Sequence, residues 1–310
     1  MIKTDVTLCS GGYRAEFRSD MGGNCYRLFH IPTGSEIFRI PKDEEHLLRE
    51  VYLLGNPILF PPNRIRGGEF EFRGTTYRFP INEPSTGCHI HGALYKTRFE
   101  IAEKRDDYVR FEYSAEAGEY LSFPHEFKLV REYTLDESGL LEAVTVHNVS
   151  QRDMPFMLAF HTTFNVPFAE DTCADNCYMQ VKVGREHIRD EKYLPTLEYV
   201  GGRARETALN EGGYPLANGS LSAFYESLGS TSLVIDKKRG LAISYEATED
   251  YKYRMLWQKA SGDFVVIEPQ TCAIDCFHLE APAEQKGLIV IPAGEKKTLK
   301  TKFAITKISE

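Results

Sequence analysis

The sequence predicts an all-β protein that folds as one large antiparallel β-sandwich with one or two short helices. Segments in which apolar and polar residues alternate recur roughly every ten to fifteen residues along the chain. Turn-forming residues separate them, as at 136–139 and 292–294. Because no helical pattern alternates with these segments, we expect the strands to pair antiparallel and to pack as face-to-face sheets.

The expected strands follow one another along most of the chain. Each shows the period of two that places alternate side chains on opposite faces of a sheet. Each is also bounded by Gly, Pro, Asn, Asp or Ser, which favour turns. In chain order, the expected strands are residues 13–17, 25–29, 70–72, 76–79, 98–102, 108–114, 126–133, 140–148, 157–161, 232–236, 241–245, 253–259, 264–268, 287–291 and 296–305.

One segment has a helical pattern. In residues 42–54, acidic side chains fill the first turn after Pro41 and apolar residues recur at helical spacing until Gly55. A second, short helix is expected near residues 190–192. Residues 204–220, rich in Gly and Asn, are expected to form a long loop.

Composition excludes two classes of partner. The 310 residues contain neither an internal repeat nor a linker, so we expect one domain over residues 1–310. The chain has 37 Lys and Arg against 45 Asp and Glu, which gives a formal net charge of −8. Binding to nucleic acids or to anionic membranes needs concentrated positive charge, so neither is expected as a partner.

The sequence also predicts the compartment. No apolar run approaches the roughly 18 residues of a membrane span, and the first residues lack the pattern of a signal peptide. An odd count of seven cysteines without an export signal favours reduced thiols and a cytoplasmic location. The pairs Cys173/Cys177 and Cys272/Cys276 are expected to be buried free thiols rather than zinc ligands, which usually stand closer in sequence. The oligomeric state stays open, with a homodimer among the states allowed.

Three histidines stand in contexts that favour a functional site. His89 and His91 are two residues apart, and in an extended segment such residues project to the same face. We therefore expect their imidazoles to point together. His161 ends an apolar stretch, which predicts a position at the rim of a sheet, where pockets form.

Glu268 is unusual because it ends an apolar strand pattern and precedes Pro269. A buried carboxylate costs free energy unless it is paired or hydrogen-bonded. The proline removes a hydrogen-bond donor from the ladder, which predicts a sheet edge or a bulge at this point. Both observations favour a carboxylate that faces a cavity, with a salt bridge at the rim as the alternative.

Asn63 and Arg64 follow two prolines that hold the backbone extended. An amide and a planar guanidinium on a rigid rim are well suited to bind hydroxyl groups. A plain surface charge is the alternative for Arg64. Three histidines with Glu268 could also ligate zinc or iron, although Tyr95 and Lys96 stand where a cupin metal motif has glutamate.

Four blocks occur in a fixed order along the chain: residues 57–65 followed by Gly67 and Gly68, His89-Ile-His91-Gly92, His161-x-x-Phe164-Asn165, and Ile267-Glu268-Pro269-Gln270-Thr271. In sequence and order they resemble the aldose 1-epimerase (galactose mutarotase-like) family. The resemblance extends over essentially the whole chain. It implies a large antiparallel supersandwich, in agreement with the strand pattern.

The resemblance also implies roles for single residues. Glu268 corresponds to the catalytic base and His161 to the catalytic acid of a sugar 1-epimerase, or mutarotase. His91 would support the ring oxygen or the acid, and Arg64 with Asn63 would hold sugar hydroxyls. The implied substrate-binding residues are His91, Arg64, Asn63, His89, Gln270 and Trp257.

Two further parts of the site are implied without a single assignment. The acidic substrate ligand of the family lies between the second histidine block and the glutamate, where the candidates are Asp236, Glu249 and Asp250. Aromatic side chains should cover one face of the sugar, and the candidates are Trp257, Phe60, Tyr95 and Phe164. Core packing is the alternative for most of these aromatic residues.

The implied reaction interconverts the α and β anomers of an aldohexose. A carboxylate can take the anomeric proton at neutral pH and an imidazolium can give one to the ring oxygen, so neither a metal nor an organic cofactor is expected. Two alternatives stay open. A hexose-6-phosphate 1-epimerase would need cationic side chains for the phosphate, for which the candidates are Arg64, Arg66, Arg73 and Arg78. A non-catalytic protein would bind carbohydrate without changing the interconversion rate.

Overall fold

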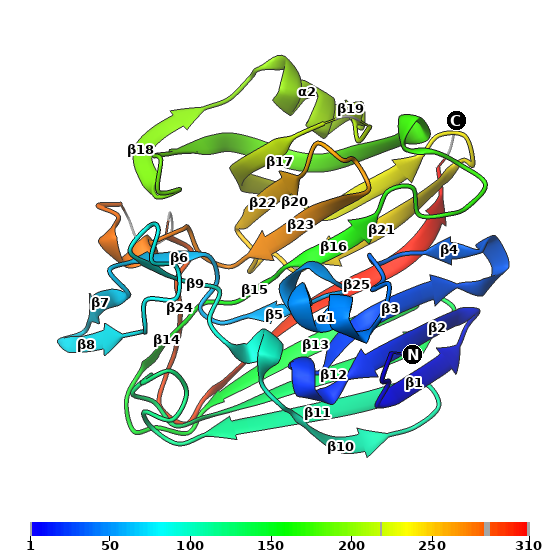
Figure 1. The fold of residues 1–310 in the computed structure, drawn as a ribbon. Helices are drawn as coiled ribbons and strands as arrows, with labels where there is room; N and C mark the ends of the chain where they lie inside the picture. The colour runs from blue at the N-terminus through cyan, green and yellow to red at the C-terminus, as the bar shows by residue number, and fades with distance from the viewer. Residues whose placement is uncertain (1, 218, 282–285, 309–310) are drawn as a thin grey trace.

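The computed structural model describes residues 2–217, 219–281 and 286–308 and confirms the all-β fold (Figure 1). Its main component is a 15-stranded antiparallel sheet. From one edge, the strands of its central path are β10 (Glu100–Lys104), β11 (Tyr108–Ala115), β12 (Phe127–Asp136), β13 (Gly139–Asn148), β25 (Lys296–Lys307), β21 (Leu241–Ala247), β20 (Leu221–Asp236), β22 (Tyr253–Gln258), β23 (Phe264–Gln270), β15 (Ala159–Phe160) and β5 (Ile58–Leu59).

Four more strands extend this sheet beside its central path. β16 (Thr162–Asn165) pairs with β23, while β17 (Cys177–Arg189) pairs with β18 (Pro195–Val200), β19 (Tyr214–Pro215) and β20. Smaller sheets complete the fold. They are β1 (Val6–Ser10) to β4 (Ser35–Glu36) with β2 (Tyr13–Arg18) and β3 (Asn24–His30), β14 (Met154–Phe156) with β24 (Ile289–Ile291), β6 (Arg64–Arg66) with β9 (Cys88–Ile90), and β7 (Glu69–Phe72) with β8 (Thr75–Arg78).

The core lies between the N-terminal sheet and the large sheet. In Figure 1 the blue strands β1–β4 lie against the green strands β11–β13. The ring of Phe17 is 4.8 Å from that of Tyr133 and 6.0 Å from that of Phe111, measured between centroids. Buried residues alternate with half-buried ones along β12, so one face of this strand contacts the core and the other faces outward.

Two helices are present in the described part of the chain, α1 (Glu44–Arg49) and α2 (Ala204–Glu211). The helix predicted over 42–54 is shorter than expected, because the backbone leaves the helical conformation at Glu50 and continues as the 3₁₀ helix η3 (Val51–Leu53). The remaining 3₁₀ helices are η1 (Ser19–Met21), η2 (Ile31–Thr33), η4 (Leu94–Lys96), η5 (Ala174–Asn176) and η6 (Cys276–His278).

The prediction for residues 190–220 was wrong in two respects. Residues 190–192 form a turn, in which the Asp190 carboxylate accepts backbone hydrogen bonds at 2.9 Å from Lys192 and from Leu194. The expected loop contains α2, whose first turn is closed by contacts between Arg203 and Glu206 and whose end is a left-handed glycine. Asn218, within the same segment, lies outside the described residues.

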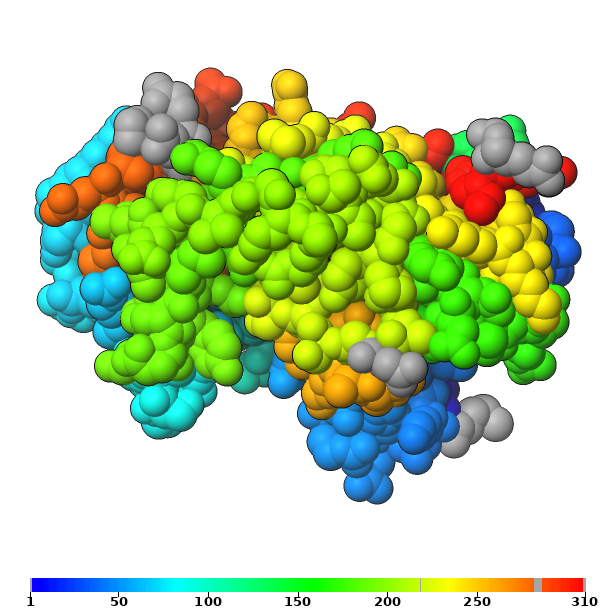
Figure 2. Space-filling model, turned by 90° about the horizontal axis from the view of Figure 1, so that it is seen from above, coloured from blue at the N-terminus to red at the C-terminus, as the bar shows by residue number. Residues whose placement is uncertain are grey.

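The strands β1, β17 and β18, the first half of β20 and several strands shorter than five residues were not predicted. β17 has 13 residues. In the view from above, the part of the chain that contains β17, β18 and α2 covers much of the visible face (yellow-green in Figure 2). The buried residues of β17 alternate through Cys177, Met179, Val181 and Val183 with more polar residues between them, so the strand pattern is present in the sequence up to Gly184 and was overlooked. No helix in the described ranges is long and apolar enough to cross a membrane.

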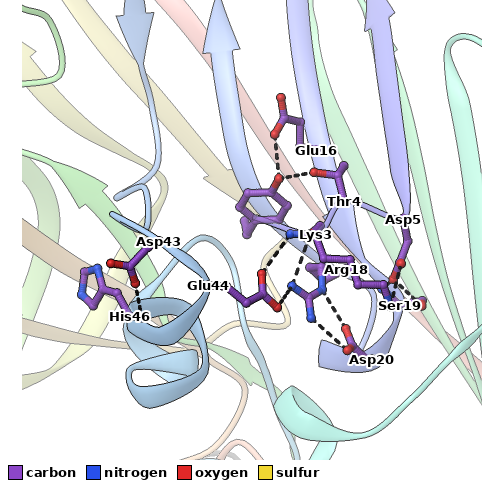
Figure 3. A network of polar contacts seen from close by, with 11 residues as sticks. Lys3, Thr4, Asp5, Glu16, Arg18, Ser19, Asp20, Asp43, Glu44 and His46 are labelled. Atoms are coloured by element: carbon purple, nitrogen blue, oxygen red, sulfur yellow. Dashed lines mark hydrogen bonds and ion pairs between the residues drawn. The ribbon is translucent and has the colours of Figure 1, made fainter. Parts of the chain in front are cut away.

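Arg18 joins α1 to the N-terminal sheet through a network of polar contacts (Figure 3). Its buried guanidinium donates to the carboxylates of Asp20 at 2.9 Å and Glu44 at 2.7 Å. Glu44 also accepts a hydrogen bond from the backbone N–H of Lys3 at 2.9 Å. Because α1 leads directly into η3, this network fixes the position of Tyr52, which lines the cavity described below.

A second network lies within the core, beneath the strands that carry the site. Arg131 and Glu142 form an ion pair at 2.5 Å, and both side chains are fully buried. Arg131 also donates to the carbonyl of Asn56 at 2.6 Å, and the Asn56 amide donates to Glu142 at 2.6 Å. Thr162 of β16 donates to the Asn56 side-chain oxygen at 2.6 Å. The network therefore ties β12 and β13 to the segments next to β5 and β16.

Removing one partner of this buried ion pair should destabilise the fold strongly. We expect Glu142→Gln and Arg131→Met each to lower the free energy of unfolding by about 3–5 kcal/mol, because each leaves a buried group without its partner. Urea denaturation measures this change. The control Glu246→Gln, at an exposed position of β21, should stay within about 0.5 kcal/mol of the wild type. A loss at Glu142 as small as that of the control would contradict this assignment.

Candidate active site

A cavity of about 700 Å³ lies over one face of the large sheet. Met255 and Trp257 of β22 and Glu268 of β23 line it, together with Ser222 of β20. Met255 pairs with Glu268 across the sheet, and Trp257 pairs with Ser222. Since residues that stand opposite each other in antiparallel strands project to the same face, these side chains form one continuous floor.

His161 and Glu268 face each other on this floor. Ala159 pairs with Gln270 and Thr162 with Ile267 in a single register, which sets His161 opposite Glu268. The Nε2 atom of His161 lies 3.6 Å from Oε1 of Glu268, and the two residues are only 5% and 3% exposed. The distance exceeds that of a hydrogen bond, so both groups can contact a ligand atom.

The ladder is interrupted where the two residues meet. Pro269 has no N–H to donate to β15. The backbone N–H of His161 points to the other side of β15, where it donates to the carbonyl of Pro57 at 2.9 Å and continues the register of β15 with β5. The sequence predicted an edge or a bulge at this point. The edge was wrong because β23 has neighbours on both sides, β22 and the pair β15 and β16. The feature is a gap in an otherwise regular pairing.

The surroundings of the pair shift both ionisation equilibria toward the neutral forms. Burial raises the pKa of Glu268 to about 8 and lowers the pKa of His161 to about 4. For Glu268, a hydrogen bond from the Gln270 amide at 2.9 Å and the positive charges of Arg189 and Arg64 act in the opposite direction. Between these two values the pair as a unit binds one proton.

His91 and Asn63 fix each other at the edge of the cavity. Both have left-handed backbone conformations, with φ of 61° and 53°. The Asn63 N–H donates to Nδ1 of His91 at 3.2 Å, and the His91 N–H donates to the Asn63 carbonyl at 3.0 Å. Burial and the neighbouring His161 hold the pKa of His91 well below its usual value. The ring is therefore neutral, and because Nδ1 accepts, Nε2 carries its proton.

Arg64 lines the cavity but its charge is already compensated. Its guanidinium donates to both carboxylate oxygens of Glu83 at 2.6 Å and lies over the ring of Tyr193 at 4.6 Å. Glu83 and Tyr193 also line the cavity. Neither Glu83 nor Tyr193 was predicted to belong to the site, because nothing in the local sequence distinguishes either of them from an ordinary loop residue.

The aromatic candidates divide between the cavity and the core. Trp257 and Tyr95 line the cavity, and Tyr52 joins them. Phe60 and Phe164 are 1% and 0% exposed and belong to the hydrophobic core, as in the core-packing alternative considered for them, so neither can cover the sugar.

His89 and Gln270 were expected to bind the substrate, but neither belongs to the described lining of the cavity. His89 is fully buried, and its Nδ1 lies 2.7 Å from the carbonyl oxygen of Pro80. The expected common direction of His89 and His91 was wrong, because the strand ends at Ile90 and the left-handed backbone turns His91 away. Gln270 contacts Glu268 instead of the cavity.

The expected acidic ligand between His161 and Glu268 is also corrected. Asp236 is buried at the end of β20, and neither it nor Glu249 or Asp250 is among the described residues of the cavity wall. That part of the chain contributes Arg189 instead, together with Tyr193 and Ser222. Arg189 ends β17, which was not predicted.

The alternative sets of residues considered for a metal ion or for a phosphate do not come together in the structure. Within the described ranges, no group of three His, Cys, Asp or Glu side chains is placed to hold a metal ion. The cysteines at 173, 177, 272 and 276 are free thiols, as expected, although Cys173 is exposed rather than buried. Of the arginines considered for a phosphate, Arg66, Arg73 and Arg78 pair with Asp275, Asp153 and Glu69 respectively.

Comparison with known proteins identifies the family. The model of the aldose 1-epimerase family matches residues 6–304. The chain belongs to the aldose 1-epimerase family. Membership in this family supports a sugar epimerase as the general function of the protein.

Similar proteins agree with this assignment. A galactose mutarotase-like protein from Clostridium acetobutylicum is 27% identical and superposes with a TM-score of 0.92, covering 99% of each chain. An aldose epimerase homologue from C. elegans has the same fold, with a TM-score of 0.78 at 14% identity over 98% of this chain and 99% of its own. The uncharacterized protein YihR of Escherichia coli K12 is 26% identical over 194 residues. This match spans 62% of this chain and 59% of YihR.

The hydrogen bond from Gln270 gives a test of the ionisation of Glu268. Because the amide stabilises the carboxylate, Gln270→Met should raise the pKa of Glu268 further above its value of about 8. The titration of ¹³C-labelled glutamate carboxyl groups by NMR measures this, with the Glu268 signal assigned by its absence in Glu268→Gln. The control Gln180→Met, on β17, should leave the midpoint unchanged. A midpoint that stays the same or falls in Gln270→Met would contradict the assigned role.

Proposed function

We propose that the protein is a cofactor-independent sugar 1-epimerase that interconverts the α and β anomers of an aldose. The observation that carries this proposal is the pair of His161 and Glu268, held 3.6 Å apart on the floor of a cavity. An acid and a base at this separation can contact the two oxygen atoms bonded to the anomeric carbon. Positioned groups of this kind contribute typically about 10²–10⁴-fold each to a reaction rate.

In the proposed reaction, Glu268 takes the proton of the anomeric hydroxyl while His161 gives a proton to the ring oxygen. The C1–O5 bond breaks, and C1 becomes an aldehyde. Rotation about C1–C2 presents the other face of the aldehyde to the C5 hydroxyl, and the same two proton transfers in reverse close the ring. Each opening and closing exchanges one proton with each residue, so the pair contains one proton before and after every step.

The burial of His161 and Glu268 suits this exchange. The state before ring opening has a carboxylate beside an imidazolium, and the state after it has a neutral acid beside a neutral imidazole. Burial favours the neutral arrangement, whereas the positive charges of Arg64 and Arg189 favour the carboxylate. The opposed effects keep the two arrangements closer in free energy than burial alone would, which is what a reversible proton exchange needs.

The remaining residues are proposed to hold the sugar. Arg64, oriented by Glu83, and Asn63 offer hydrogen bonds to hydroxyl groups. The neutral His91 can donate from Nε2 near His161, whose ring centroid is 5.6 Å away. Trp257 and Tyr95 provide apolar surface for the C–H face of a pyranose ring.

Replacement of either member of the pair should abolish most of the activity. We expect Glu268→Gln and His161→Gln each to slow the interconversion of α-glucose or α-galactose by about 10²–10⁴-fold. NMR exchange spectroscopy measures the rate at equilibrium. The control Glu249→Gln, at an exposed position away from the described cavity wall, should retain the wild-type rate.

Two results would contradict the proposal. One is a wild-type protein that accelerates none of the aldoses tested. The other is a rate that stays unchanged in both Glu268→Gln and His161→Gln. Saturable sugar binding with an unaccelerated interconversion would instead indicate a non-catalytic carbohydrate-binding protein.

A further inference from the structure

Arg189 brings an uncompensated positive charge to the cavity. It ends β17, is half-buried, and lines the cavity wall. One terminal nitrogen, Nη2, donates to the carbonyl of Ser222 at 2.7 Å and to its hydroxyl at 3.1 Å. The other, Nη1, lies 3.7 Å from the sulfur of Met255. Within the described part of the chain, no carboxylate forms an ion pair with this guanidinium.

The neighbouring charges do not neutralise it. The charge of Arg64 is compensated by the carboxylate of Glu83, to which its guanidinium donates two hydrogen bonds at 2.6 Å. The pair of His161 and Glu268 is neutral as a unit while it holds one proton. Lys96, at the exposed rim, adds another positive charge to the described lining. The cavity therefore has an excess of positive charge, although the formal net charge of the whole chain is −8.

The position of Arg189 relative to the reacting groups is set by the sheet. Met255 stands directly opposite Glu268 in the pairing of β22 with β23. The Arg189 guanidinium contacts Met255, so Met255 lies between it and the carboxylate. Neighbouring strands are about 4.8 Å apart, so a pyranose with its C1 at the pair extends over Met255. A substituent on the far side of the ring then reaches Arg189.

The chemistry of Arg189 specifies what that substituent is. A guanidinium taken partly out of water without an opposite charge is unfavourable, and an anionic ligand removes this cost. Its planar donors match the oxygen atoms of a carboxylate or a phosphate better than they match a single hydroxyl. Ser222 provides a hydroxyl beside them. A neutral sugar would leave this charge without a partner.

We propose that the substrate is an aldose that carries an anionic oxygen-rich group, a carboxylate or a phosphate, bound by Arg189 at the end of the cavity away from C1. The proposal rests on the proposed epimerase function and defines its substrate class. The two anionic groups share the chemistry that Arg189 recognises, so the experiment below separates them.

The test compares anomer interconversion of glucose, glucuronate and glucose 6-phosphate by NMR exchange spectroscopy. For the wild type, we expect kcat/KM for one of the two anionic sugars to exceed that for glucose by at least about tenfold. In Arg189→Gln the ratio of anionic to neutral kcat/KM should fall by about 10- to 100-fold, the range expected for hydrogen bonds to a charged group. The better anionic substrate shows whether the group is a carboxylate or a phosphate.

Two variants keep the test decisive. Arg185→Gln removes an exposed arginine of the same strand, which pairs with Glu226, and should leave the ratio unchanged. Arg189→Lys retains the charge but not the planar fork, and should keep part of the preference. It also covers the case in which Arg189→Gln does not fold.

The outcomes distinguish this inference from the proposed function. If the wild type interconverts glucose at least as well as both anionic sugars, or if Arg189→Gln and Arg189→Lys leave the ratio unchanged, the anionic substrate is excluded while the epimerase function stands. If no sugar is interconverted faster than in the absence of protein, the epimerase function and this inference both fail.

Discussion

The chemistry proposed for this protein depends on the register of one strand pairing. His161 and Glu268 meet because the short strands β15 and β16 pair with β23 in a single register, across a gap where Pro269 cannot donate. A shift by one residue would turn one of the two side chains to the other face of the sheet. On the other side of β15, the N–H of His161 donates to the carbonyl of Pro57 and continues the pairing with β5, which holds His161 beside the gap. On the other side of β23, Glu268 pairs with Met255, and the Met255 sulfur contacts Arg189.

Such a site needs support from the layer beneath it. Thr162, next to His161, bonds to Asn56, and Asn56 is held by the buried pair of Arg131 and Glu142. These contacts are fully buried, so they are poorly replaced by water and fix the segments on both sides of the gap. Burial of His161 and Glu268 opposes both of their charges. The buried network on one side of the sheet thus holds His161 and Glu268 in place. Their burial in the cavity on the other side sets their protonation equilibria.

Much of the fold could be predicted from the sequence, and the reasons are visible in particular elements. Strands such as β12 and β13 have one face in the core, and the resulting alternation is strong. Glu268 and His161 were found because a polar residue at the end of an apolar run is unusual. The first half of β17 alternates and was overlooked, whereas Arg189 could not be placed from the pattern because the alternation breaks at Gly184, where the pairing with β20 shifts register. The direction of His91 depends on a left-handed backbone and could not follow from spacing, and the partnership of Arg64 with Glu83 depends on tertiary contact alone.

In the proposed mechanism, His161 and Glu268 act as one unit that exchanges a single proton with the sugar. The most direct test combines Glu268→Gln and His161→Gln in one protein and compares its anomer interconversion rate with those of the single variants. If the two groups act together, the second replacement adds little, and the double variant should be within about threefold of the slower single variant. If the fold-losses in rate of the two single variants multiply in the double variant, the two residues act independently, and a shared proton exchange is excluded.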